Sequence, residues 1–249
     1  MGATVSIGRR PLLIGLAVVA LSAGGGLWWQ QHPSFLYLTG QTAEFEGLFA
    51  APPAPDSTAT RRELDELLDL QNHRTPADVT AAQADRKKDI SRFYAALGLD
   101  SGRQWEVPAL QKLTDRAEAE IGPYVRVAKE KYRRLRPYEI EQTLKPCIGD
   151  VKGDLSYPSG HATYGYLMGY LLSELVPERR GALMQRSEEY ARQRLVCGVH
   201  FRSDIEAGQR GAQFLFEKMQ ESTAYLEDAR AASRELRAAL GLKPVAGGR

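Results

Sequence analysis

The sequence predicts an all-α protein folded as a single-domain helical bundle. Hydrophobic residues recur at helical spacing in successive segments bounded by prolines, glycines and capping residues, and no convincing strand-like alternation of apolar and polar residues is present. A length of 249 residues suits one domain with short extensions. Charged residues make up 26% of the chain and the mean hydropathy is −0.38, a balance typical of globular rather than polytopic membrane proteins.

The N-terminus carries the one long apolar stretch, and residues 1–29 are expected to be a signal peptide or an N-terminal anchor. Two arginines precede an apolar run over residues 11–21, and small residues at 22–24 offer a cleavage site, as in secretory signals. Uncleaved, residues 11–29 are long enough to span a bilayer. The sequence therefore predicts an exported, periplasmic protein, which contacts the membrane only if this segment is retained.

Composition divides the rest of the chain into three parts. Residues 30–58 end in a Pro-rich polar stretch and are expected to be an extended segment. Residues 59–222 carry most of the helical patterns and are expected to form the main helical domain. Residues 223–249 are expected to be a charged C-terminal helix followed by a loose tail.

The helical patterns follow one another closely along the chain. Thr60 is a candidate cap for the first, Pro108 starts the third, and Pro123 is expected to break or kink the pattern around it. Gly165 and Gly169 would leave room for a close neighbouring helix. The expected helices cover residues 60–71, 76–98, 108–122, 123–137, 161–176, 179–200, 203–220 and 223–241.

The residues Pro158, Ser159, Gly160 and His161 open the apolar helix expected over 161–176. The first turn of a helix presents unpaired backbone N–H groups and the positive end of the helix dipole. Gly160 lets a ligand approach the backbone closely, and Ser159 adds a hydroxyl donor. The segment is a candidate anion site beside His161, and simple capping of the helix by Ser159 is the alternative.

Lys129 and Arg136 form a second candidate element. They lie seven residues apart, two helical turns, so we expect them on one helix face. Arginine is a forked donor for phosphate, and lysine is a mobile point charge. The alternative is a solvated basic face shared with Lys131, Arg133 and Arg134.

Arg194, His200 and Asp204 form a third element. Asp204 follows His200 by four residues, so on a helix or a turn entering one its carboxylate can reach the ring. A carboxylate on one ring nitrogen fixes the tautomer and leaves the other nitrogen free to attack an electrophile. A surface ion pair is the alternative for this pattern.

The order and spacing of the three elements, K-x6-R-P, P-S-G-H and R-x5-H-x3-D, resemble the signature of the type 2 phosphatidic acid phosphatase superfamily, which includes vanadium haloperoxidases. More narrowly, "RLRPY", "SYPSGHATYGY" and "VCGVHFRSD" are similar to the class A bacterial non-specific acid phosphatases. The motifs span Lys129 to Asp204, and the wider likeness covers most of residues 45–222. Gln193 departs from the pattern, which usually has serine before the arginine of the third element.

The resemblance implies a helical fold of the type 2 phosphatidic acid phosphatase kind, with 59–222 as its catalytic domain. It implies hydrolysis of phosphate monoesters of broad range through a phosphohistidine, with His200 as nucleophile, Asp204 orienting it and His161 as proton donor. The phosphate-binding residues would be Lys129, Arg136, Ser159, Gly160 and Arg194. Phosphoryl transfer needs mainly positioning and charge stabilisation, and no metal-ligand cluster is recognisable, so we expect no metal and no cofactor.

Several alternatives remain open on the sequence alone. The protein could be a membrane-associated lipid phosphate phosphatase of the same superfamily, a vanadate-dependent haloperoxidase or a non-catalytic phosphate-binding module. Cys147 and Cys197 could form a disulfide in an exported protein or be buried thiols. The expected partners are small phosphorylated substrates, and association with a second copy of the chain stays open. The net charge of +2 gives no case for nucleic acid.

A pH dependence follows from the expected roles. His200 must be neutral to attack, and His161 must be protonated to donate a proton. Asp204 is expected to raise the pKa of His200, whereas the three cations lower it. We therefore expect activity at mildly acidic pH.

Overall fold

The computed structural model describes residues 2, 35–40, 42–100, 102–149 and 154–244. The expected signal peptide or anchor over residues 1–29 lies almost wholly outside the described residues. Within the described part of the chain, no helix combines the length and the apolar character that a membrane crossing needs.

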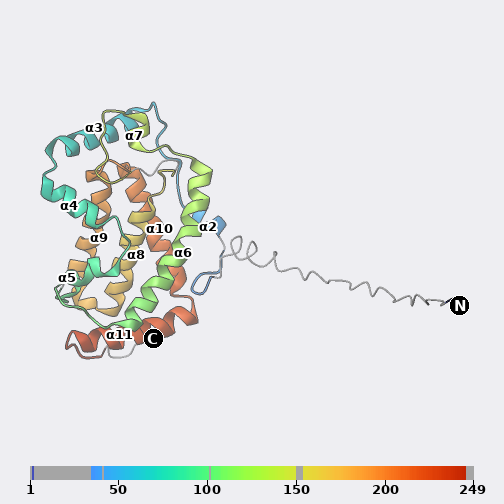
Figure 1. The fold of residues 1–249 in the computed structure, drawn as a ribbon, viewed down its shortest axis with the longest axis vertical. Coiled ribbons are helices and arrows are strands. Elements are labelled where there is room, and N and C mark those ends of the chain that lie inside the picture. The colour runs from blue at the N-terminus through green and yellow to red at the C-terminus, as the bar shows by residue number, and fades with distance from the viewer. Residues whose placement is uncertain (1, 3–34, 41, 101, 150–153, 245–249) are drawn as a thin grey trace. The chain divides into compact units, whose positions relative to one another are not determined.

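The described residues form helices and connecting loops, with no strand among them, so the predicted all-α class is confirmed (Figure 1). One compact unit begins at Phe35. Its α-helices are α2 (Thr42–Gly47), α3 (Thr58–His73), α4 (Pro76–Ala84), α5 (Tyr94–Leu97), α6 (Pro108–Tyr132), α7 (Pro137–Ile140), α8 (Gly160–Leu175), α9 (Arg180–Val196), α10 (Arg202–Met219) and α11 (Thr223–Ala239). Two 3₁₀ turns, Ile90–Phe93 and Pro177–Arg179, precede α5 and α9.

Helix α8 lies at the centre and packs closely against α9 on one side and α10 on the other (Figure 1). Glycines make this approach possible. A Cβ at Gly169 would lie 2.0 Å from the Ser187 hydroxyl oxygen on α9, and one at Gly165 would lie 2.7 Å from the Tyr190 ring. On the other side, a Cβ at Gly208 of α10 would lie 2.8 Å from the carbonyl oxygen of Ser159. The predicted close neighbour of α8 is thus confirmed as α9.

Helices α6 and α11 complete the core. A break or a kink was expected at Pro123; helix α6 runs through Pro123 without ending, so the break is wrong. Helix α11 packs on α6 and α8, and its Tyr225 and Leu236 are wholly buried in the core that the other helices share. The C-terminal helix is therefore part of the main domain, although the sequence division at residue 222 had separated it. Residues 245–249 of the expected tail lie outside the description.

Two other elements differ from expectation. The segment expected to be extended contains α2, because Phe45 is wholly buried and packs edge-on against Phe49 and Tyr124, with ring centroids 5.0 and 5.6 Å away. The helix expected over 76–98 is interrupted after α4. The buried carboxylate of Asp85 accepts hydrogen bonds there from two arginines, at 2.8 and 2.6 Å, which holds the connecting turn.

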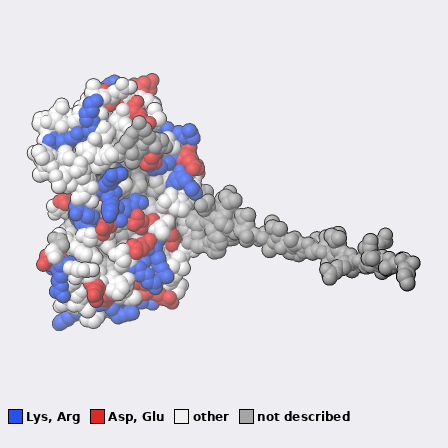
Figure 2. Space-filling model, viewed as in Figure 1, with Lys and Arg blue, Asp and Glu red and all other residues white. Residues whose placement is uncertain are grey.

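Helix α3 begins at Thr58, two residues before its expected start. Ser57 is its N-cap and accepts a hydrogen bond from the Thr60 N–H at 3.2 Å, so the cap is Ser57 and not Thr60. The surface carries mixed charge. On the face drawn in Figure 2, Lys and Arg side chains are interspersed with Asp and Glu, in keeping with the small net charge.

Candidate active site

The site is assembled from the start of α10, the start of α8 and the loops that follow α6. His200 and Asp204 flank the first turn of α10, and their side chains are 2% and 0% exposed. The ring nitrogen Nδ1 of His200 lies 3.1 Å from Oδ2 of Asp204. The sequence spacing therefore placed the pair correctly, but in the interior. The alternative of a surface ion pair is wrong for these two residues.

The carboxylate of Asp204 is held by donors from several segments. It accepts hydrogen bonds from the Phe201 N–H at 2.8 Å, from Nη1 of Arg134 at 2.7 Å and from the Ser156 hydroxyl. The His200 ring provides a further contact. Because each of these donors comes from a different position in the chain, the carboxylate has one orientation, and the ring that it contacts is fixed with it.

The hydrogen bonds of His200 define its tautomer. Nη1 of Arg136 lies 2.6 Å from Nε2 of the ring, and a guanidinium can only donate, so Nε2 must be the acceptor. The proton of the neutral ring is then on Nδ1 and is donated to Asp204. Burial, and then the charges of Arg136 and Lys129, lower the pKa of His200 well below its ordinary value. The ring is thus neutral, with its lone pair on Nε2.

The start of α8 adjoins this pair. Ser159 is wholly buried and caps α8, accepting a hydrogen bond from the Ala162 N–H at 3.2 Å. Its own N–H donates to the carbonyl of Asp204 at 3.0 Å, which ties the start of α8 to α10. A Cβ at Gly160 would meet Val125 at an ordinary contact distance of 3.5 Å, so packing does not require glycine there.

His161 lies in the first turn of α8 and is partly buried. Its Nε2 lies 2.9 Å from the carbonyl oxygen of Arg86, so Nε2 carries a proton, and the ring stacks over Tyr190 with centroids 6.4 Å apart. Burial, and then the charge of Arg194, lower the pKa of His161 to about 3. In the neutral ring, Nδ1 is therefore the nitrogen with a free lone pair.

Lys129 and Arg136 come together by a route that the sequence did not predict. Helix α6 ends at Tyr132, and Arg133 adopts the left-handed conformation with φ 48°, so the two residues do not share a helix face. Both nevertheless reach Asp154, at 2.8 Å for Nζ of Lys129 and through Nη2 of Arg136. Burial, and then the charge of Arg136, lower the pKa of Lys129.

Arg194, near the C-terminal end of α9, is 2% exposed. Among the described residues, its Nε and Nη1 have no hydrogen-bond partner. Burial, and then the charge of Arg136, lower its pKa to about 10. An unpaired buried guanidinium is costly for a protein, so this side chain is the strongest sign of an anion site.

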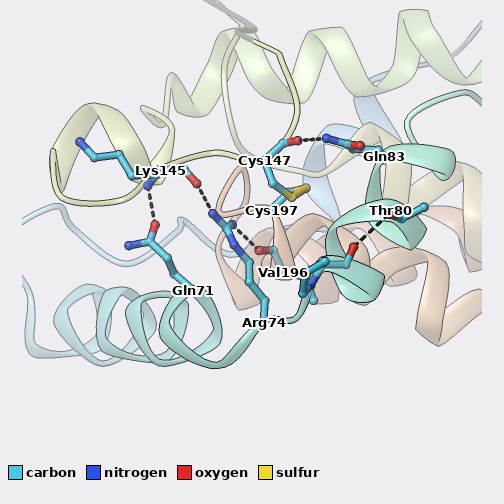
Figure 3. The surroundings of a disulfide bond; sticks show 9 residues. Gln71, Arg74, Thr80, Gln83, Lys145, Cys147, Val196 and Cys197 are labelled. Atoms are coloured by element: carbon cyan, nitrogen blue, oxygen red, sulfur yellow. Dashed lines mark hydrogen bonds between the residues drawn. A yellow bond between two sulfur atoms is a disulfide. The ribbon is translucent and has the colours of Figure 1, made fainter.

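A disulfide between Cys147 and Cys197 supports the loops around the site (Figure 3). Arg74 donates to backbone carbonyls on both sides of the bridge, at 2.9 and 2.7 Å, and Gln83 donates to the carbonyl of Cys147 at 3.0 Å. These contacts tie the loop after α7 to the end of α9, three residues before His200. The sequence had left open the choice between a bridge and free thiols.

Sequence reasoning missed Asp154, which contacts Lys129 and Arg136, and two further residues of the site. Arg134 was grouped with a solvated basic face, but it is 6% exposed and contacts Asp204, Ser203 and Glu63. Ser156, wholly buried, contacts the same carboxylate. Only the position of Ser156 beside the anion motif was a signal for it, and nothing in the sequence separated Arg134 from its exposed neighbours. Within the described residues, no group of three or more His, Cys, Asp or Glu is placed to hold a metal ion.

The fold is similar to that of a known membrane phosphatase. A transmembrane PAP2 type phosphatidylglycerolphosphate phosphatase from Bacillus subtilis superposes with a TM-score of 0.50 at 15% identity, covering 72% of this chain and 90% of that one. The predicted helical fold of the type 2 phosphatidic acid phosphatase kind is thereby confirmed. No family model matches the chain.

The sequence is similar to those of bacterial non-specific acid phosphatases. The chain is 37% identical over 101 residues to the non-specific acid phosphatase of Salmonella typhimurium, covering 39% of this chain and 40% of that protein. It is 27% identical over 185 residues to the non-specific acid phosphatase of Providencia stuartii, covering 70% and 74%. The match thus spans about two fifths of the Salmonella protein. The resemblance to the non-specific acid phosphatases is confirmed.

Proposed function

We propose that the protein is a metal-independent acid phosphatase that hydrolyses phosphate monoesters of broad range through a phosphohistidine intermediate. The observation that carries the proposal is the buried His200, whose Nδ1 is held by Asp204 and whose Nε2 faces the cation Arg136. A neutral imidazole fixed in this tautomer is a nucleophile, and adjacent cations are what a phosphoryl group requires.

In the proposed first step, Nε2 of His200 attacks phosphorus and the bond to the ester oxygen breaks. Arg136 must first transfer its Nη1 hydrogen bond from Nε2 to a phosphoryl oxygen, which frees the lone pair. His161, protonated on both nitrogens, gives the Nδ1 proton to the leaving alkoxide. The products of this step are the free alcohol, neutral His161 and a phosphoryl group on His200.

In the proposed second step, water replaces the histidine on phosphorus. His161 Nδ1 takes one proton from the attacking water, the bond between Nε2 and phosphorus breaks, and phosphate leaves. Asp204 stabilises the imidazolium character that His200 gains during both steps, through the Nδ1–H hydrogen bond. The second step restores His200 to its neutral form and His161 to its protonated form.

The phosphoryl oxygens would be held by charges and by the start of α8. The proposed contacts are Lys129, Arg136, Arg194, the Ser159 hydroxyl and the Gly160 N–H. The unpaired nitrogens of Arg194 support its place in this set. A dianionic phosphoryl group here would raise the pKa of His161 from about 3, because it offsets the charge of Arg194 that lowers it.

The proposal includes the setting of the protein. The substrates would be small phosphorylated compounds, and the apolar N-terminus would export the chain to the periplasm or anchor it in the membrane. Lipid phosphates are the alternative substrates, and they share the same phosphate chemistry.

The test is hydrolysis of p-nitrophenyl phosphate by the full chain between pH 4 and 9, with and without EDTA. We expect activity that peaks below pH 7, survives EDTA and is lost on His200→Ala. His73→Ala is the matched control and should retain full activity, because His73 is an exposed histidine on α3 whose ring nitrogen Nδ1 contacts Asp69. Loss of activity with EDTA, or activity that survives His200→Ala, would contradict the proposal. Hydrolysis of a lipid phosphate alone would favour the alternative.

A further inference from the structure

Asp154 is a carboxylate placed directly on two of the proposed phosphate-binding cations. Its Oδ1 accepts a hydrogen bond from Nζ of Lys129 at 2.8 Å, and its Oδ2 accepts one from Nη2 of Arg136. Its backbone carbonyl also accepts from Nε of Arg136 at 3.0 Å. The two carboxylate oxygens therefore bridge the two cations in the way that two oxygens of a phosphoryl group would.

The carboxylate and the two cations of this bridge differ in solvent exposure. The side chain of Asp154 is 50% exposed, whereas those of Lys129 and Arg136 are 13% and 3% exposed. The cations are thus fixed in the interior and the carboxylate reaches them from the solvent side. Asp154 can move into water at small cost, because water solvates the carboxylate as soon as it leaves.

The other carboxylate of the site cannot move in this way. Asp204 is wholly buried and is held by Arg134, Ser156 and the backbone of Phe201. None of these donors is a proposed phosphate ligand. Asp204 is therefore a fixed part of the site, and Asp154 is the carboxylate that shares its cations with the ligand.

We propose that Asp154 is a built-in competitor of the phosphoryl group, which sets the affinity of the site for substrate and expels the phosphate product. This inference rests on the proposed function, because that function assigns Lys129 and Arg136 to the phosphoryl oxygens. Two anions cannot occupy the same donor atoms, so a bound phosphoryl group displaces Asp154 and the returning carboxylate displaces phosphate. Competition by Asp154 therefore weakens the affinity for the substrate and the affinity for the phosphate product by the same factor.

The competitor is charged throughout the working pH range. Burial opposes its ionisation, but the hydrogen bonds and charges of Lys129 and Arg136 outweigh burial and hold the pKa of Asp154 below its ordinary value. Lowering the pH to 5 therefore does not remove the competition.

The test is binding of inorganic phosphate to the full chain, measured by calorimetry, because it requires no turnover. We expect Asp154→Asn and Asp154→Ala to bind phosphate about tenfold more tightly or better, which corresponds to about 1.4 kcal/mol. Asp154→Glu keeps the carboxylate and should bind phosphate nearly as weakly as the parent chain. The KM for p-nitrophenyl phosphate should fall by the same factor as the dissociation constant.

The matched control is Glu46→Gln. Glu46 pairs with Lys131 at 3.0 Å, so this change removes a similar carboxylate from another lysine of α6 outside the site. It should leave phosphate binding unchanged. Equal or weaker binding by Asp154→Asn would overturn the inference, since it would mean that Asp154 positions the cations for the ligand.

A second measurement uses the unsubstituted chain. The carboxyl carbon of Asp154, followed by NMR, should shift on addition of phosphate as the carboxylate leaves its two cations, whereas that of Glu46 should not. No shift at Asp154 when phosphate is bound would overturn the inference. If the parent chain binds no phosphate at all, the proposed function itself fails. If the parent chain binds phosphate but Asp154 does not respond, only the inference about Asp154 fails.

Discussion

The two histidines of the site lie in contrasting surroundings. Around His200, both ring nitrogens are engaged, and the Asp204 carboxylate is held by donors from three other residues. Around His161, the pKa is lowered to about 3 and the neighbouring Arg194 has two buried nitrogens without a partner in the described part of the chain. The first region is satisfied by the protein itself. The second has cationic nitrogens without a hydrogen-bond partner. Under the proposed function, the protein would order the nucleophile His200 in advance, and the phosphoryl group of the substrate would complete the acid His161.

The largest expected effect comes from loosening the ordered region. Asp204→Asn should lower kcat by on the order of 10³–10⁴, because asparagine does not enforce the Nδ1–H tautomer of His200. The free energy of unfolding should also fall, since Arg134 keeps only Glu63 of its two carboxylate partners. Kinetics and urea unfolding measure the two effects. Asp69→Asn, at an exposed position on α3, is the control and should leave kcat unchanged. A kcat of Asp204→Asn within tenfold of the parent would contradict this role for Asp204.

Substitutions of two buried arginines, Arg194 and Arg134, test the same contrast. Arg194→Met should lower activity by on the order of 10²–10³, with no loss of stability, because it removes a buried guanidinium whose Nε and Nη1 have no hydrogen-bond partner among the described residues. Arg134→Met should lower both activity and stability, because it leaves Asp204 and Glu63 without their shared donor. Thermal unfolding and kcat/KM of the two variants can be compared directly. Equal destabilisation by both would mean that Arg194 is a structural residue.

Dependence on the leaving group tests the unsatisfied region. His161→Ala should lower the rate of the first step, measured as alcohol release within a single turnover, by about 10²–10⁴ for an alkyl phosphate, the usual range for a general acid. The first step with p-nitrophenyl phosphate should slow much less, because nitrophenolate leaves without a proton. With the parent chain, activity should fall from below pH 7 toward pH 9, as the complex loses the proton that His161 donates. An activity profile that still rises above pH 8, or equal losses with both substrates, would exclude His161 as the acid.

The pKa directions also predict how stability depends on pH. The folded pKa of His161 is about 3 and that of His200 is well below the ordinary 6.5, so the unfolded chain binds more protons as the pH falls. These two residues therefore contribute stability that is present above pH 6.5 and is lost progressively below it. Bound phosphate should reduce this loss, because it raises the pKa of His161 in the folded state. Urea unfolding at pH 5 and 7.5, with and without phosphate, measures both effects.

The smallest expected effect is at Gln193, where the related pattern has serine. The Oε1 atom of Gln193 is buried without a partner among the described residues. Gln193→Ser should leave the free energy of unfolding unchanged or raised and alter kcat/KM by less than about tenfold, because no proposed contact to the phosphoryl group is removed. A loss comparable with that of Arg194→Met would show that Gln193 supports the site directly.

The sequence predicted those parts of the site that depend on local spacing. Asp204 lies one helical turn beyond His200, and Ser159 stands at the start of an apolar helix, so both placements follow from the helix period and capping rules. The close packing of α8 on α9 followed from Gly165 and Gly169, because two glycines four residues apart lie on one face of a helix.

The parts that depend on how the chain turns were not predictable. Arg133 takes the left-handed conformation and ends α6 one turn early, which turns Arg134 inward to Asp204 and removes Arg136 from the helix face of Lys129. The bridging position of Asp154 depends on the same turn, since Arg136 reaches it from outside the helix. A single arginine conformation therefore decides what several charged residues contact, and no periodicity reports it.

The most direct test of the account is to trap the intermediate on the full chain. The protein is mixed with p-nitrophenyl phosphate labelled in its phosphoryl group, quenched within the first turnover in alkali, where phosphohistidine is stable, and digested to locate the label. We expect label on His200, none in His200→Ala, and more label in His161→Ala, because water is no longer activated for the second step. Label on another residue, or hydrolysis without any labelled protein in the parent and in His161→Ala, would contradict the central claim that His200 is the nucleophile.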